Sequence, residues 1–352
     1  MSRTVLCLTG LGVLWLGSLP LACCFGPYPL DMAGVWQALC AFFAGNQGPP
    51  QNISQDIPQI VVGQIRLARV LLAALVGGAL AVAGAGLQGV LRNPLADPFT
   101  LGIAAGAACG ASLVLAGYGM ALGFVGGFGG SLALNTVLGL ASLMGALLAL
   151  ACALWLGRGQ GDFDRTGVVL AGIAVATFLG ACVALVKALN EESVTSIVFW
   201  VLGSLQGRGW AQLPLLLATL VPGLALVFAH WRALDVLALG QEEAAQLGVN
   251  VAQVRLQLLL GTSLLTAGCV AVSGVIGFVG LVVPHTLRLL LGVSHGRLLA
   301  GAFLGGGVLL VWADCIARGL LDGGQELPVG VVTAFLGGPF FALLVHRGQR
   351  RA

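Results

Sequence analysis

Side chains that could carry out chemistry are scarce in this sequence. Its 352 residues include 16 basic and 13 acidic side chains, four histidines and nine cysteines. Catalysis inside a membrane would need clustered carboxylates or a nucleophile beside a base, yet the adjacent acidic pairs, Glu191-Glu192 and Glu242-Glu243, both fall in expected loops. The cysteines form no C-x-x-C pair and have no histidine at metal-ligand spacing, which is typical of apolar packing. We therefore expect no catalytic residue, no metal site and no cofactor.

The motifs also exclude nucleotide chemistry. The stretch from Gly84 to Gly89 matches the dinucleotide pattern G-x-G-x-x-G, but it lies in an apolar run, and that pattern functions between a strand and a helix. Lys187 is the only lysine and follows Val186, so no G-K-[ST] P-loop can form. The net charge of +3 gives no indication of a nucleic-acid partner, and we expect none.

The composition is that of a membrane protein. Apolar residues make up 58% of the chain and charged residues 8%, against about 25% charged residues in soluble domains, and the mean hydropathy is +1.01. A helix that crosses the hydrocarbon needs about 20 mostly apolar residues. We expect an all-α polytopic protein with a single transmembrane domain over residues 1–352. Its ten spans are expected within 3–31, 69–92, 97–158 (two, hinged at the glycine-rich stretch 117–130), 168–186, 213–228, 255–288 (two, breaking near Ser273 and Gly274), 298–316 and 328–345.

Charge predicts the orientation of these spans. Residues 346–351 are basic and should be cytoplasmic by the positive-inside rule, and an even number of spans places Arg3 on the same side. We therefore expect an inner-membrane protein with both termini in the cytoplasm. The basic residues expected near the outer face, against the rule, are Arg66, Arg69, Lys187, Arg208 and Arg318.

The N-terminal apolar run allows a second interpretation. Cys23 and Cys24 follow it, as in a signal peptide or a lipoprotein precursor. The run from Thr4 to Phe25 is longer than the 7–15 apolar residues of a signal peptide, and Pro20 stands where a lipoprotein signal needs an aliphatic residue. We favour a membrane helix, and processing of this segment stays open.

The first of four informative segments lies around the second expected span. It begins at Arg66-Leu67-Ala68-Arg69, continues through Gln88 and ends at Arg92-Asn93-Pro94-Leu95-Ala96-Asp97-Pro98. Its two prolines stand four residues apart, so they should end a helix and force a compact turn. Asn93 and Asp97 are suited to bond the free backbone groups of that turn.

The second and third segments lie at opposite faces of the expected topology. Phe199 to Leu205, with Trp210, contains indoles that suit the outer interface. Arg232 to Val249 is expected in the cytoplasm as two short helices around Gly240, with Gly248 suited to end the second helix. A polar hairpin of this kind needs either water or a partner surface.

The fourth segment extends from Gly277 to His285, continues at Ala313 to Arg318 and ends at Leu327 to Gly330. In this order and spacing, the four segments resemble the permease family of type II ABC importers for iron-siderophores, haem and vitamin B12. The resemblance covers about residues 65–341. That family usually has a proline and a charged pair at the positions of Ala68, Ser294 and Gly296.

The resemblance implies ten membrane helices per protomer in a homodimer embedded in lipid, with two ATP-binding cassette ATPase subunits and a periplasmic substrate-binding protein as partners. It also implies that Arg66, Arg69 and Arg318 receive carboxylates of the binding protein, a task for which the planar guanidinium fork is suited. The residues implied to couple to the ATPase are Asp235, Gly240, Glu242, Glu243, Ala244, Leu247 and Gly248. The residues implied to form the structural motifs are Gln88, Asn93, Pro94, Asp97, Pro98, Pro284, His285 and Asp314.

Two other functions remain open on the residues alone. A proton-coupled secondary transporter would want a carboxylate near the membrane midplane, and Asp314, the only carboxylate well inside an expected span, lies near its outer end. His285 could relay a proton or simply pack near the interface. An integral membrane enzyme would need the catalytic cluster that is missing. Nothing in the sequence distinguishes an iron-siderophore, haem or a cobamide as the cargo.

Overall fold

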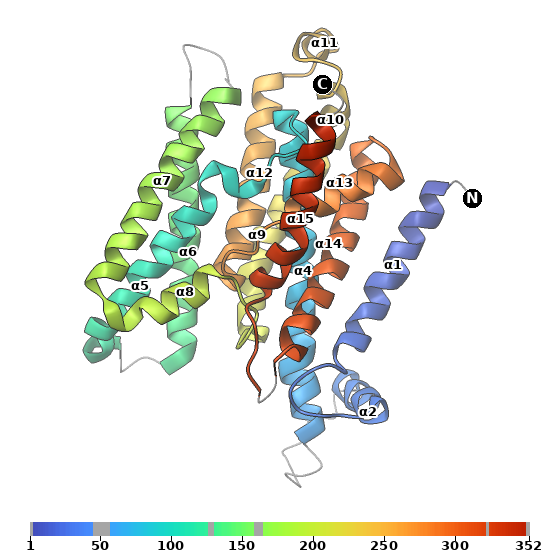
Figure 1. Cartoon of the computed structure of the whole chain (residues 1–352). Helices are drawn as coiled ribbons and strands as arrows, with labels where there is room; N and C mark the ends of the chain where they lie inside the picture. The colour runs from blue at the N-terminus through green and yellow to red at the C-terminus, as the bar shows by residue number, and fades with distance from the viewer. Residues whose placement is uncertain (1–2, 45–56, 126–129, 158–164, 322–323, 350–352) are drawn as a thin grey trace.

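The computed structural model describes residues 3–44, 57–125, 130–157, 165–321 and 324–349 (Figure 1). Every regular element in these ranges is helical, so the predicted all-α class is confirmed. A helix satisfies its backbone polar groups internally, which lipid cannot do for it. The helices are α1 (Arg3–Ala22), α2 (Met32–Phe43), α4 (Leu67–Leu91, preceded by the π-helical turn Ile60–Arg66), α5 (Ile103–Val125), α6 (Gly130–Leu156), α7 (Arg165–Leu189), α8 (Val194–Val201), α9 (Leu213–Ala229), α10 (Trp231–Leu237), α11 (Gln241–Gln246), α12 (Val251–Ser273), α13 (Val279–Leu291), α14 (His295–Gly319) and α15 (Val329–Gln349).

The predicted spans correspond to helices of the structure. Within the described residues, α1, α4, α6, α7, α9, α12 and α14 are long and apolar enough to cross a membrane, and α2, α5, α13 and α15 contain shorter apolar stretches. The ten predicted spans fall on α1, α4 to α7, α9 and α12 to α15. The extra helix α2 was not anticipated, and the number of helices that cross the membrane remains a prediction.

The two spans predicted to be hinged at the glycine-rich stretch 117–130 are α5 and α6, and the change from one to the other falls near the C-terminal end of that stretch. Helix α5 continues to Val125 and α6 begins at Gly130, and residues 126–129 lie outside the described part of the chain. Glycine is common in membrane helices, since the helix still pairs its backbone groups internally. Helix α5 therefore continues through most of this stretch before α6 begins.

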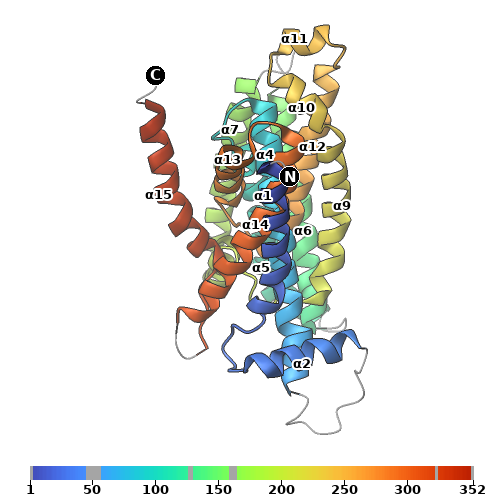
Figure 2. The same ribbon diagram turned by 90° about the vertical axis from the view of Figure 1, so that its right-hand side faces the viewer.

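Helix α4 lies at the centre of the bundle, in contact with α1, α9, α12, α13 and α14 (Figures 1 and 2). It is buried on almost every side. A Cβ atom added at Gly84 would overlap the backbone of Gly280 in α13, so glycine at both positions allows the two helices to touch backbone to backbone. The glycine pattern that imitates a dinucleotide motif thus has a packing role.

The helix break predicted near Ser273 and Gly274 is confirmed. Helix α12 ends at Ser273, and Gly274 has a φ of +69°, a conformation that favours glycine. The carbonyl of Ser273 accepts a hydrogen bond from the backbone N–H of Ser204 at 2.8 Å. Irregular backbone at membrane depth is tolerated where protein covers it, and α13 resumes as a helix of 13 residues.

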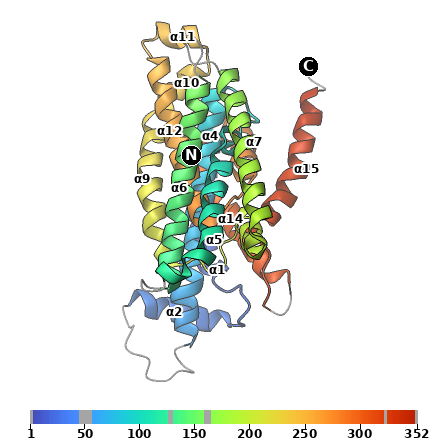
Figure 3. The same ribbon diagram turned by 90° about the vertical axis from the view of Figure 1, so that its left-hand side faces the viewer.

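The two ends of the bundle differ. Helices α10 and α11 project from one end, and α2 lies across the other (Figures 1 and 2). Helix α1 begins and α15 ends toward the end that carries α10 and α11, which agrees with both termini on one side of a membrane (Figures 1 and 3). Which side that is remains a prediction from charge.

Candidate functional site

Arg69 and Asp314 form the centre of a buried ionic cluster in the half of the bundle that carries α2. Arg69 lies in the first turn of α4, and Asp314 lies five residues before the end of α14. The Arg69 Nη2 atom is 2.8 Å from Asp314 Oδ1, and Nε is 3.0 Å from Oδ2. This side-on, two-bond geometry is the strong form of a guanidinium–carboxylate pair.

Two further charged side chains complete the cluster. Arg318 Nε lies 3.1 Å from Asp314 Oδ2, and Arg69 Nη1 lies 2.7 Å from Glu326 Oε2. Glu326 belongs to the linker between α14 and α15, just before the Leu327-Pro328 pair. Sequence reasoning missed Glu326, although a carboxylate in an expected outer loop, on the side of three arginines, was the signal that could have found it.

Arg66 and Arg318 both bind the loop that follows α1. The Arg66 Nη1 group donates to the carbonyl of Cys23 at 2.8 Å, and its Nη2 group donates to the carbonyl of Tyr28. Arg318 Nη1 donates to the carbonyl of Phe25 at 3.1 Å. Because two arginines hold one loop, the end of α1 is fixed to both α4 and α14.

The structure therefore brings the three predicted docking residues together, but it buries them. Arg66, Arg69 and Arg318 are 4%, 6% and 4% exposed, respectively. A carboxylate from another protein could reach Arg69 only after one of its present partners had moved. Their role in docking stays a prediction. We refer to Arg66, Arg69, Arg318, Asp314 and Glu326 as the outer arginine cluster, after the side of the membrane that charge predicts for them.

The second group of predicted site residues lies at the other end of the bundle. The hairpin predicted for residues 232–249 around Gly240 is present as α10 and α11. Gly248 has a φ of +82° just after the last turn of α11, where a left-handed residue commonly ends a helix. Leu237 and Ala244 pack in a small apolar core between the two helices, so the hairpin has a fixed shape of its own.

The outer surface of this hairpin mixes apolar and acidic side chains. Leu239 is 66% and Leu247 is 65% exposed, and Glu242 and Glu243 are exposed in the first turn of α11. Exposed leucines beside charged groups are typical of a surface that binds another protein. The coupling role predicted for these residues is not tested by the geometry.

Asp235 attaches the hairpin to the body of the bundle. Its Oδ1 atom lies 2.8 Å from His295 Nδ1 and accepts a hydrogen bond from the His295 backbone N–H at 2.7 Å, and the Ser294 hydroxyl donates to Oδ2 at 3.3 Å. A carboxylate is stabilised at the start of a helix, here α14, by the free N–H groups there. Arg92 at the end of α4 adds a bond of 2.6 Å to the carbonyl of Ala238.

The motif residue Gln88 connects α4 to α13. Its Nε2 group donates to the carbonyl of Gly280 at 3.3 Å, and its Oε1 atom accepts from Arg288 Nη1 at 3.0 Å. His285, in the same helix α13, lies with its ring edge-on to Phe340 of α15, with 5.9 Å between ring centroids. That contact favours the packing interpretation of His285 over a proton relay.

The turn after α4 has the predicted proline-flanked geometry. Arg92 adopts a left-handed conformation with a φ of 49°, which ends α4. Asn93 Oδ1 accepts the backbone N–H of Leu95, and Asp97 Oδ1 accepts that of Phe99, both at 2.9 Å. Burial raises the pKa of Asp97 from 3.8 to about 6, although the bond from Phe99 acts in the opposite direction.

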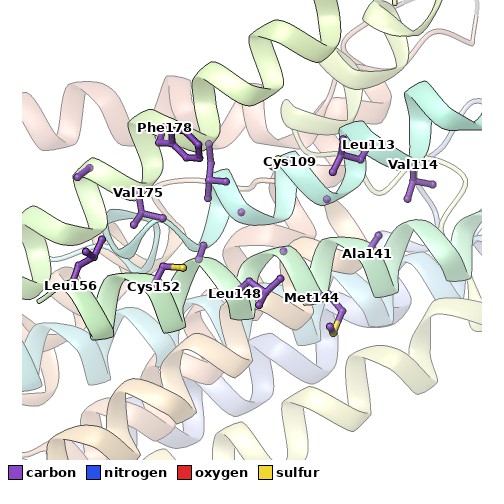
Figure 4. Close-up of a pocket in the computed structure, with 16 residues that line it drawn as sticks. Cys109, Leu113, Val114, Ala141, Met144, Leu148, Cys152, Leu156, Val175 and Phe178 are labelled. Carbon is purple, nitrogen blue, oxygen red and sulfur yellow. The ribbon is translucent and has the colours of Figure 1, made fainter. Parts of the chain in front are cut away.

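A cavity of about 740 Å³ lies between α5, α6 and α7 (Figure 4). Its walls are almost entirely apolar, with Met144, Phe178 and the thiols of Cys109 and Cys152 among the lining side chains. Such a surface offers nothing to orient a charged chelate. Within the described residues, no three His, Cys, Asp or Glu side chains gather where they could hold a metal ion.

Comparison with known proteins identifies the relatives of this chain. The model of the FecCD transport family matches residues 13–347. The hemin transport system permease protein HmuU of Yersinia pestis is 42% identical over 298 residues, which cover 82% of this chain and 83% of that protein. The cobalamin import system permease protein BtuC of Halobacterium salinarum is 37% identical over 319 residues, covering 90% and 81%.

A solved structure has the same fold. It is described as an inward-facing conformation of a metal-chelate type ABC transporter, and it superposes with a TM-score of 0.78 at 30% sequence identity. The superposition covers 97% of this chain and 98% of that one. The arrangement of helices described above is therefore shared over the full length of both chains.

Proposed function

Since this chain belongs to the FecCD transport family, whose members are permeases of ABC importers and not enzymes, we propose that it carries an iron chelate, haem or a cobamide across the inner membrane. The match over residues 13–347 is the observation that carries this proposal. In the proposed assembly, the chain forms one transmembrane domain over residues 1–352 in a homodimer, with both termini in the cytoplasm.

The outer arginine cluster is the proposed docking site for a periplasmic binding protein. Three guanidiniums gather in one half of the bundle, and two of them pair with Asp314. Arginine is suited to receive a carboxylate at an interface because it is always charged and presents a rigid fork of donors. The proposed partner therefore presents acidic side chains to this end of the permease.

The hairpin of α10 and α11 is the proposed contact with the ATPase. It projects from the opposite end of the bundle (Figure 1), and its exposed Leu239 and Leu247 could enter an apolar cleft of the partner. The hydrogen bonds that Asp235 accepts from His295 would transmit a displacement of the hairpin to α14. Two ATPase subunits, one for each permease copy, would then drive the change in access.

A proton-driven carrier is the weaker alternative. Asp314, its best candidate for a proton-carrying carboxylate, is fully buried and forms ion pairs with both Arg69 and Arg318. Both ion pairs would have to break before this carboxylate could pass a proton along a transport path. The ion pairs thus favour ATP-driven import.

Uptake into liposomes tests the transport proposal. The permease, reconstituted with its ATPase and its binding protein, should accumulate one of three labelled cargoes, namely cobalamin, haemin or a ferric hydroxamate, and should do so only with ATP. The purified chain alone should hydrolyse no ATP, since Lys187 lies in no P-loop. Accumulation that follows a proton gradient without ATP would favour the carrier.

A binding assay tests the docking site separately. Changing Arg69 or Arg318 to lysine keeps the charge but removes the fork, and each change should weaken binding of the binding protein at least about tenfold, equivalent to 1.4 kcal/mol. Docking of the native complex should also weaken as salt rises. The matched control is Lys187→Gln in the last turn of α7, and an equal loss in that variant would rule out a specific site.

A further inference from the structure

Every guanidinium of the outer arginine cluster already has partners inside the protomer. The side chains of Arg69 and Glu326 are 7% and 9% exposed, and that of Asp314 is fully buried. An arginine in this state cannot accept a carboxylate from outside as it stands. If Arg69 docks another protein, one of its two acidic partners must first leave.

The two acidic partners differ in how firmly they are held. Asp314 is part of α14, binds both the Nε and Nη2 groups of Arg69, and also pairs with Arg318. Glu326 lies outside any helix and contacts Arg69 through one Nη1 group at 2.7 Å. Removal of Asp314 would take away the carboxylate that Arg69 and Arg318 share, whereas removal of Glu326 would break one hydrogen bond of Arg69 alone. Glu326 is therefore the exchangeable partner.

We propose that Glu326 occupies Arg69 as an internal substitute for a carboxylate of the docking protein, and that docking exchanges the one carboxylate for the other. This inference rests on the proposed docking function. The exchange conserves charge: the cluster contains three arginines and two carboxylates before docking, and the same number after an incoming carboxylate has replaced Glu326. A buried cluster tolerates such a swap far better than the loss or gain of a charge.

The position of Glu326 gives the exchange a consequence for α15. The next residue, Leu327, donates its backbone N–H to the carbonyl of Ala317 at 3.0 Å, and Gly330 at the start of α15 donates to the carbonyl of Gly203 at 3.1 Å. Release of Glu326 thus loosens the linker that fixes the start of α15. That helix diverges from the rest of the bundle (Figures 2 and 3), so docking would act on a helix that stands apart from the others.

Affinity measurements test the exchange. The permease, assembled with its ATPase in lipid nanodiscs, is titrated with the binding protein that sustains its uptake in liposomes. The Glu326→Gln variant removes the competing charge and should bind that protein roughly tenfold more tightly than the native complex. In an Arg69→Gln background, the Glu326→Gln change should leave the affinity for the binding protein unchanged, because the guanidinium for which the two carboxylates compete has been removed. The control is Glu192→Gln, an exposed carboxylate after α7, which should leave affinity unchanged.

Hydrogen exchange gives a second measurement that needs no binding protein. The amide of Leu327 should exchange faster in the Glu326→Gln complex than in the native one, and addition of binding protein to the native complex should produce the same increase. Unchanged or weaker docking of Glu326→Gln, while Arg69→Gln still weakens docking, would overturn the exchange and keep the docking site. If Arg69→Gln docks normally, the docking site itself is wrong and the exchange falls with it.

Discussion

Arg69 and Asp314 stand 245 residues apart in the sequence, yet the Nη2 and Nε atoms of the arginine lie 2.8 and 3.0 Å from the two carboxylate oxygens. The pair joins the first turn of α4 to the last turns of α14. It also places a negative charge between Arg69 and Arg318. Buried ion pairs between side chains thus join α4 and α14 at the end of the bundle that carries α2.

The Asp314→Asn variant should be strongly destabilised. The amide keeps the shape of the carboxylate but removes the negative charge between Arg69 and Arg318, so that Glu326 is the only carboxylate left in the cluster, and breaking a buried pair in this way costs about 3–5 kcal/mol. Unfolding in mixed micelles should therefore begin at a lower denaturant concentration. The control is Asp31→Asn, an exposed residue at the start of α2, and an equally small effect at both positions would contradict the buried ionic role.

Local signals in the sequence predicted the helices and their interruptions well. The break at Ser273 and Gly274 followed from the length of a charge-free interval, and the hairpin followed from a polar run divided by Gly240. The hinge expected within residues 117–130 could be placed only within that stretch, because composition does not show which of several glycines lies inside a helix. Helix α2 was missed because its 12 residues are too few for a span.

The ionic contacts between distant residues could not be predicted in the same way. Arg69, Arg318 and Asp314 stand out by residue type, but the sequence pointed to an external partner for the arginines and to a structural motif for Asp314. Their pairing depends on how α4 and α14 pack. A single sequence does not show which residues of two distant helices lie within hydrogen-bond distance. Glu326 was passed over because it lies in a loop, where a carboxylate usually faces water.

Gly84→Ala should destabilise the bundle, against the general trend for helices. Alanine in place of glycine inside a helix ordinarily stabilises the helix by about 1 kcal/mol. Here, however, the new methyl group would overlap the backbone of Gly280. The two helices would have to separate, at a cost of about 1–3 kcal/mol. Gly180→Ala in α7 is the matched control because nothing lies within 4 Å of its Cβ position. Thermal unfolding should shift downward for the first variant and not for the second.

Joint replacement of Leu239 and Leu247 by serine should detach the ATPase without unfolding the permease. Both side chains are largely exposed, so their loss costs the isolated fold little, whereas full burial of a leucine side chain at an interface contributes about 1.5–3 kcal/mol. Co-purification and ATPase affinity are the measurements. Leu189→Ser at the end of α7, where the side chain is 73% exposed, is the control. Retention of the ATPase by the double variant would place its contact elsewhere.

His295→Ala should separate ATP hydrolysis from transport. The imidazole and the backbone N–H of His295 both bind Asp235, so the variant keeps the hairpin but loosens its attachment to α14. We expect assembly with the ATPase to be preserved while the number of cargo molecules moved per ATP falls several-fold. Asp235→Ala should have an effect at least as large, since it also removes the bonds from the His295 backbone N–H and the Ser294 hydroxyl, and the double variant should be little worse than Asp235→Ala alone. Additive losses would mean that the two residues act independently.

Asp97 should make the stability of the permease depend on pH between about 4 and 6. Burial raises its pKa in the folded chain from 3.8 to about 6, so the folded state binds the proton more tightly than the unfolded state does. By linkage, the native protein gains stability as pH falls from 6 toward 3.8, and above pH 6 its folded state contains the charged form of this buried carboxyl group. The Asp97→Asn variant keeps an oxygen that can accept the Phe99 N–H but carries no charge at any pH. It should therefore be more stable than the native protein at pH 7, by up to about 3 kcal/mol, and the stabilities of the two proteins should converge near pH 4.

Unfolding of both proteins in detergent between about pH 4 and 7 is the measurement. A stability difference that stays constant with pH would show that Asp97 does not titrate in this range.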